Sequence, residues 1–135
     1  MQTITINGIK FQILPFNARK ATNVERKLMC VLLPVITPLL NAKGTLDSDI
    51  DLSSLGPAFQ EGFGRLSDDD FFNLILETMS STTAVLKDKA PILIENEQSF
   101  NEVFTGSTMT IYKLIWEIMK VNKFCFLELM DGKLM

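Results

Sequence analysis

The side chains that could perform chemistry in this sequence are few, and their spacing does not suit catalysis. The chain has no histidine, which removes the commonest general base and the commonest metal ligand. Its two cysteines, Cys30 and Cys125, lie far apart in apolar surroundings and lack the spacing of a metal site. We expect both to be small buried hydrophobic residues in a reducing compartment, with a disulfide between them as the alternative.

Three alternating aspartates, Asp47, Asp49 and Asp51, resemble the start of a calcium-binding loop. However, Leu52 occupies the position where such a loop needs glycine, and no glutamate stands at its twelfth position. We therefore expect a solvated acidic loop here rather than a metal site.

A second acidic run, Asp68 to Asp70, is the one candidate for a pair of catalytic carboxylates. It follows Ser67 and precedes an apolar stretch that begins at Phe71. Serine is a favoured N-cap residue, and the positive end of the helix dipole stabilises acidic residues in the first turn. The run therefore predicts the start of a helix, and the sequence predicts no catalytic residue, no cofactor and no metal.

Composition limits the class of protein. The 135 residues are 47% hydrophobic and 21% charged, which is typical of one globular domain spanning residues 1–135. The net charge is −3 and there is no basic run, which argues against nucleic acid as a partner. The apolar stretch from Leu28 to Leu40 is interrupted by Pro34 and Pro38, so we expect no membrane span. The first residues also lack the pattern of a signal peptide.

The clearest local pattern is at the N-terminus. Apolar and polar residues alternate from Thr3 to Leu14 on both sides of the dipeptide Asn7-Gly8. This dipeptide accepts positive φ at both turn centres, so the pattern predicts a β-hairpin. An isolated hairpin is barely stable in water, and its apolar face must therefore rest on helices or on a strand of another chain.

The segment after the hairpin predicts a long apolar helix. Asn17 is its expected N-cap, and its apolar residues extend towards Leu40. Proline removes a backbone donor and clashes with the preceding turn. We therefore expect the helix either to kink at Pro34 and Pro38 or to stop near Leu33 and restart.

The middle of the chain predicts short elements between connections. Residues 44–66 are expected to form a connection in which apolar residues spaced by four allow one or two helical turns. Residues 84–94 predict a second hairpin or two short extended pieces. Ser99, with Glu102 three residues later, predicts the capping box of a short helix over residues 100–105.

The stretch from Met109 to Asn122 carries the only tryptophan and the only tyrosine, and it predicts an amphipathic helix with a wide apolar face. The helix either ends at Asn122, with this residue as a left-handed cap, or continues into an apolar segment that needs a partner. Large apolar residues of this helix and of the following segment either bind a partner or fold into the domain's own core. The candidates for partner binding are Trp116, Met119, Phe124, Phe126 and Leu127.

The order of these pieces resembles the tail assembly chaperones of long-tailed bacteriophages and prophages. The resemblance covers most of the chain and depends on short motifs, none of them catalytic. They are a strand pair leading into Leu-Pro-Phe-Asn (Leu14 to Asn17), a long apolar helix with Glu25 and Arg26, the acidic-capped helix, Ser-Phe-Asn-Glu-Val-Phe-Thr-Gly (Ser99 to Gly106), and the Trp116 helix ending in Val121-Asn122-Lys123-Phe124.

The residue patterns predict a mostly helical α+β domain with an N-terminal β-hairpin, and the segment 84–94 predicts either a second short hairpin or two extended pieces. The family resemblance adds an expected function. It implies a non-catalytic chaperone of the bacterial cytoplasm that binds and solubilises the apolar tape measure protein and assists assembly of the tail tube protein. Self-association is expected separately, because the apolar stripes and hairpin edges exceed what a small domain easily buries. The alternatives are a small phage regulator that binds nucleic acid and an enzyme that uses Asp68 to Asp70.

Overall fold

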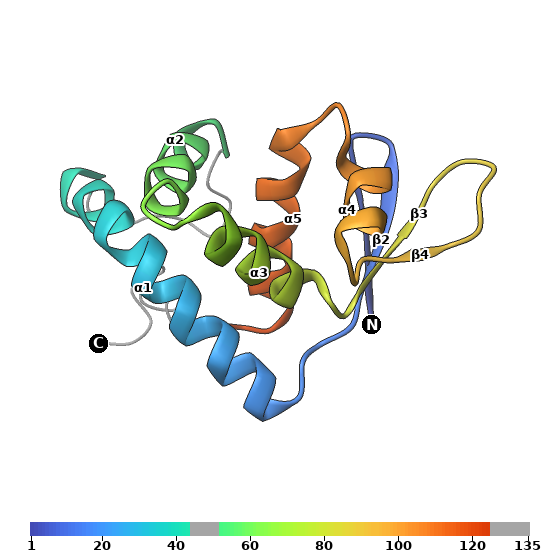
Figure 1. Cartoon of the computed structure of the whole chain (residues 1–135). Coiled ribbons are helices and arrows are strands. Elements are labelled where there is room, and N and C mark those ends of the chain that lie inside the picture. The colour runs from blue at the N-terminus through green and yellow to red at the C-terminus, as the bar shows by residue number, and fades with distance from the viewer. Residues whose placement is uncertain (44–51, 125–135) are drawn as a thin grey trace.

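The computed structural model describes residues 1–43 and 52–124 (Figure 1). The described residues form an α+β domain, as the sequence predicts, with a sheet on one side of the molecule and helices on the other. The elements in chain order are β1 (Gln2–Ile6), β2 (Ile9–Ile13), α1 (Ala18–Lys43), α2 (Leu52–Phe63), α3 (Asp68–Met79), β3 (Thr82–Val85), β4 (Ile92–Leu93), α4 (Glu97–Phe104) and α5 (Thr108–Val121).

The four strands form one antiparallel sheet in the order β1-β2-β3-β4. The N-terminal hairpin is confirmed: Asn7 and Gly8 have φ angles of 52° and 80°, the left-handed values that a tight two-residue turn requires. The second hairpin, β3 with β4, is also confirmed. The sequence did not predict that β2 pairs with β3, which joins the two hairpins into one sheet.

One face of the sheet carries the core. Phe11 and Ile13 of β2 are fully buried, and the Phe11 ring stacks on Phe104 of α4 with ring centroids 6.0 Å apart. Residues of the opposite face, such as Thr3 and Thr5, are exposed. The period of two along each strand therefore separates a covered face from an open one.

Helix α1 runs from Ala18 to Lys43, so it does not stop near Leu33. Asn17 caps it as predicted, because its Oδ1 accepts a hydrogen bond from the Lys20 amide at 2.9 Å. Each proline costs one backbone hydrogen bond. We attribute the continuation of the helix to its packing against α2, a contact that the sequence did not predict.

Within the expected connection over residues 44–66, the helical turns that the apolar spacing allowed are confirmed, but they extend to a full helix, α2 (Leu52–Phe63). Residues 44–51, with the three alternating aspartates, lie outside the described part. Helix α2 approaches α1 closely at Gly62, where an added Cβ would lie only 2.7 Å from the carbonyl oxygen of Val31. Any larger side chain would force the two helices apart here, so Gly62 is a helix-packing residue.

The starts of α3 and α4 test two predicted caps. Ser67 is confirmed as the N-cap of α3, since its hydroxyl accepts from the Asp70 amide at 3.2 Å. The predicted cap of α4 is wrong: Asn96 is the N-cap, and Ser99 lies three residues later as its capping-box partner. The Asn96 Oδ1 accepts from the Ser99 amide, and the Ser99 hydroxyl accepts from the Asn96 amide. Glu102 is exposed on the helix.

Helix α5 is the central helix of the domain and contacts β1, α2, α3 and α4 (Figure 1). It is therefore buried around most of its circumference rather than on one face. Trp116, which the helical pattern puts beside the charged side, packs near Phe59 of α2, with ring centroids 6.4 Å apart. The sequence did not predict this contact, because residues 44–66 were expected to form a connection with at most one or two helical turns.

Candidate functional site

Three of the five residues predicted to bind a partner lie in the domain's own core. Trp116 and Phe124 are each 2% exposed and Met119 is fully buried. This is the alternative that the sequence left open, and it removes these three side chains from the accessible surface. Phe126 and Leu127 lie outside the described residues.

The end of α5 explains the burial of Phe124. Lys123 has a φ of 52°, and its amide donates to the carbonyl of Lys120, while the Phe124 amide donates to the carbonyl of Met119. This is a Schellman motif, in which the side chain after the left-handed residue folds back on the last turn. The helix therefore ends at Asn122 as predicted, but the left-handed residue is Lys123, and Asn122 has an ordinary φ of −86°.

Asn122 has another role. Its Oδ1 accepts a hydrogen bond of 2.7 Å from the amide of Phe16, and its Nδ2 donates to the Ile118 carbonyl at 2.9 Å. The two sequence motifs Leu14 to Asn17 and Val121 to Phe124 therefore touch, although they lie at opposite ends of the chain. This contact explains why a polar residue stands within the apolar pattern: it ties the end of α5 to the start of α1.

The described surface is hollowed along the boundary between α1 and α3. We call this hollow the α1–α3 groove. Its volume is about 350 Å³, and both helices contribute its walls. The groove is lined by Arg26, Lys27, Cys30 and Val31 of α1, by Leu66 before α3, and by Asp70, Asn73, Leu74 and Glu77 of α3.

The groove has apolar side chains between charged ones. Val31, Leu66 and Leu74 are partly or wholly buried, whereas Arg26 and Asp70 are exposed. The rim therefore carries positive charge on α1 and negative charge on α3. An apolar strip with a polar rim is the usual form of a surface that accepts an amphipathic helix.

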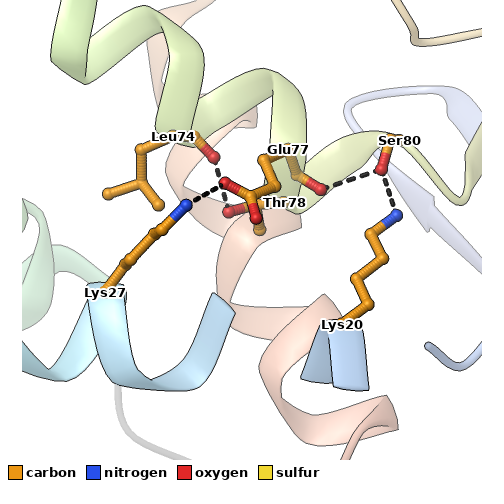
Figure 2. Close-up of polar contacts among 6 residues, drawn as sticks. All are labelled: Lys20, Lys27, Leu74, Glu77, Thr78 and Ser80. Carbon is orange, nitrogen blue, oxygen red and sulfur yellow. Dashed lines mark hydrogen bonds and ion pairs between the residues drawn. The ribbon is translucent and has the colours of Figure 1, made fainter. Parts of the chain in front are cut away.

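Two lysines of α1 bridge to α3 at the end of the groove (Figure 2). The Lys27 ammonium pairs with the Glu77 carboxylate at 2.7 Å, and the Lys20 ammonium donates to the hydroxyls of Ser80 and Ser81. Lys20 also lies 4.5 Å from the centre of the Phe16 ring. Partial burial lowers the pKa of Lys20 below its usual value of 10.5, and Glu77 opposes part of this shift.

A second hollow of about 480 Å³ continues beyond these bridges and shares Glu77 with the groove. Its other walls are Asn17, Arg19, Lys20 and Asn23 of α1. The boundary between α1 and α3 is therefore indented over much of the length of α3, and the exposed part is more polar near the start of α1.

The α1–α3 groove offers apolar, charged and thiol side chains for contact. Cys30 is exposed in the groove, so the prediction that it is buried is wrong; the period of α1 turns it away from the core side of Leu28 and Leu32. Cys125 lies outside the described residues. Among residues 1–43 and 52–124, no three histidine, cysteine, aspartate or glutamate side chains come together as a metal site.

Sequence reasoning missed the groove. Helical periodicity alone puts Leu74 on a buried helix face and Arg26 on a polar one, with nothing to indicate that the two helices are neighbours. The groove exists because α1 and α3 lie side by side, and no local pattern in either helix gives that placement. In the part of the chain that the structure describes, no helix is both long enough and apolar enough to cross a membrane.

The described residues form a small α+β fold with a groove between α1 and α3. Residues 7–132 match the family model described as "Phage tail assembly chaperone protein, TAC". The match covers nearly the whole chain, and the protein belongs to this family of phage tail assembly chaperones. No curated protein and no solved structure matches the chain.

Proposed function

We propose that this protein binds the tape measure protein of a phage tail, keeps it soluble before the tail tube forms, and assists the tail tube protein without catalysing a reaction. The proposal rests on family membership over residues 7–132. A tape measure protein is long, helical and apolar, and such a helix aggregates unless another surface covers its apolar face. We infer that this activity occurs in the bacterial cytoplasm, where the client is made.

We propose the α1–α3 groove as the binding site for the client. A client helix would place its apolar residues on Val31, Leu66 and Leu74 and its polar flanks against the charged rims. The rims differ in sign, with Arg26 on one and Asp70 on the other, so they accept a helix that carries both charges on its flanks.

The predicted partner residues Phe126 and Leu127 remain part of the proposal. They follow the buried Phe124 closely in the chain and are large and apolar. We propose that they add a second contact to the client, and that Trp116, Met119 and Phe124 act indirectly by holding the core on which the binding surface is built.

Co-expression with the tape measure protein tests the function. We expect the client to appear in the soluble fraction with the wild-type chain and in the insoluble fraction without it. A client that stays insoluble with the folded wild-type chain would overturn the proposed function. If the wild-type chain solubilises the client and the groove variants described below solubilise it equally well, only the assignment of the site is overturned.

A matched pair of variants tests the groove. Cys30→Glu puts a charge inside the groove, whereas Thr22→Glu puts the same charge on another exposed position of α1. We expect Cys30→Glu to reduce the soluble client several-fold and Thr22→Glu to leave it unchanged, with both melting temperatures close to wild type. Alkylation of Cys30 should slow when the client is bound, measured in a Cys125→Ser background.

A further inference from the structure

The sheet of this domain has two edges, and they differ in how they are protected. At one edge, β4 has only two residues, Pro91 precedes it, and the loop before it carries charges from Lys87 to Lys89. Short length, proline and charge are the features by which proteins block pairing with another strand. The other edge, β1, is five residues long, and residues 1–6 contain no proline and no charged side chain.

The register of the first hairpin decides which backbone groups of β1 bond to β2 and which point away from it. Ile6 pairs with Ile9 across the two-residue turn, so this closing pair exchanges backbone hydrogen bonds. Alternation along the strand then directs Gln2 and Ile4 to β2 as well. The amides and carbonyls of Thr3 and Thr5 point away from β2, and both residues are exposed.

We propose that two copies of this chain associate through β1, with the strands antiparallel about a two-fold axis at Ile4. This register pairs all five residues of the strand: Gln2 with Ile6, Thr3 with Thr5, and Ile4 with Ile4 of the other copy. Thr3 and Thr5 exchange backbone hydrogen bonds with Thr5 and Thr3 across the axis. The two sheets thereby become one continuous sheet.

The side chains suit a second copy as the occupant. Ile4 is half-buried on the core face, and the axis brings the two Ile4 side chains together as a closely spaced pair without backbone hydrogen bonds between them. On the open face Thr3 meets Thr5, and such threonine pairs are favourable across strands. Each chain has a net charge of −3, yet the paired strands bring no charged side chains together, so association meets little local repulsion.

This inference does not depend on the proposed function. The client proposed above is a helix, and a helix has no free backbone groups to pair with a strand edge. An extended segment of a client is the competing occupant of β1, and the experiment below separates the two.

Sedimentation of the purified full-length chain tests the proposal with a charge pair. In Thr3→Glu/Thr5→Glu, each new carboxylate faces a carboxylate of the other copy, and the like charges repel. The carboxylate at position 5 also lies opposite Lys10 of its own chain, which offsets part of this repulsion. We expect this variant to dimerise roughly tenfold more weakly than wild type. In Thr3→Lys/Thr5→Glu, opposite charges face each other across the axis, and we expect the dimer to be restored.

Two further variants separate pairing from folding. Thr5→Pro removes an amide that points outward, so the monomer should keep its circular dichroism and melting temperature while the dimer is lost. Gln12→Glu adds a charge to the same face on the neighbouring strand and should leave the dimer intact. A wild-type chain that is monomeric at micromolar concentration overturns the proposal. If hydrogen exchange of the Thr3 and Thr5 amides in such a chain slows only when a client is added, an extended client segment is the occupant of β1 instead. The proposal is also overturned if Thr3→Glu/Thr5→Glu and Thr5→Pro both form dimers as tightly as wild type.

Discussion

Phe124 shows how burial of a single residue changes the interpretation of a sequence. Because it is 2% exposed and packs behind the left-handed turn at Lys123, its role is to hold the end of α5 against the core. We predict that Phe124→Ala lowers the free energy of unfolding by about 3–5 kcal/mol, measured by urea denaturation. Met109→Ala is the control, because Met109 is 42% exposed on the same helix. A Phe124→Ala protein with wild-type stability would contradict this placement.

Thr82 is a residue at which the sequence is not optimal for stability. Its side chain is fully buried in β3, and its hydroxyl has no hydrogen-bond partner among the described residues. Valine has a similar shape and suits a strand, so we predict that Thr82→Val raises stability by up to about 1 kcal/mol in urea denaturation. The buried Thr78 hydroxyl donates to the Leu74 carbonyl at 2.8 Å, and Thr78→Val should bring no such gain.

Tyr112 gives the protein a pH dependence in alkali. It lies among the rings of Phe59 and Phe63, and burial raises its pKa above the usual 10.0. The folded state thus holds the phenol proton more tightly than the unfolded state, so this stabilisation is complete below pH 10.0 and is lost as the pH rises through the raised pKa.

The lowered pKa of Lys20 acts in the opposite direction, because its unfolded state binds more protons as the pH approaches 10.5. Lys20 is the same in wild type and Tyr112→Phe, so its effect cancels when the two are compared. We predict that the melting temperature of wild type falls relative to Tyr112→Phe above pH 10.0. Parallel curves for the two proteins across this range would refute the assignment.

At the scale of elements, α4 depends on a cap that differs from the predicted one. The Ser99 hydroxyl accepts from the amides of Glu95 and Asn96, and the Asn96 Oδ1 accepts from the Ser99 amide. We predict that Asn96→Ala or Ser99→Ala costs about 0.5–2 kcal/mol by thermal unfolding. Glu102→Ala should change stability by less than about 0.5 kcal/mol, because Glu102 is exposed and outside the cap. If Glu102→Ala lost more stability than Asn96→Ala, the capping box predicted from sequence, Ser99 with Glu102, would be correct instead.

Helix α1 shows how packing outweighs local preference. Proline disfavours the interior of a helix, yet α1 is one element from Ala18 to Lys43 through Pro34 and Pro38. Its neighbour α2 contains Gly62 at a point of close approach, where a side chain would collide with the Val31 carbonyl. The pairing of α1 and α2 is therefore tighter than the composition of either helix indicates.

At the scale of the whole molecule, helix α1 and the sheet lie on different sides of the domain (Figure 1), and the proposed client groove and the proposed β1 interface belong to these two parts. We predict that Cys30→Glu leaves the oligomeric state unchanged in sedimentation, and that Thr5→Pro leaves client solubilisation unchanged on co-expression. Thr22→Glu is the control for both measurements. Loss of both activities in either folded variant would show that the two surfaces are coupled.

The sequence alone determined the features that local backbone preference controls. Asn7-Gly8 sets the first hairpin because both residues accept positive φ, and Ser67 with its aspartates sets the start of α3 because they satisfy the free amides and the dipole of that end. Helical periodicity located α5, and short motifs together indicated the family. Only the tertiary structure decided the pairing of β2 with β3, the burial of Trp116 and Phe124, and the groove between α1 and α3. Each of these depends on which segments distant in sequence become neighbours, and a pattern within one segment does not contain that information.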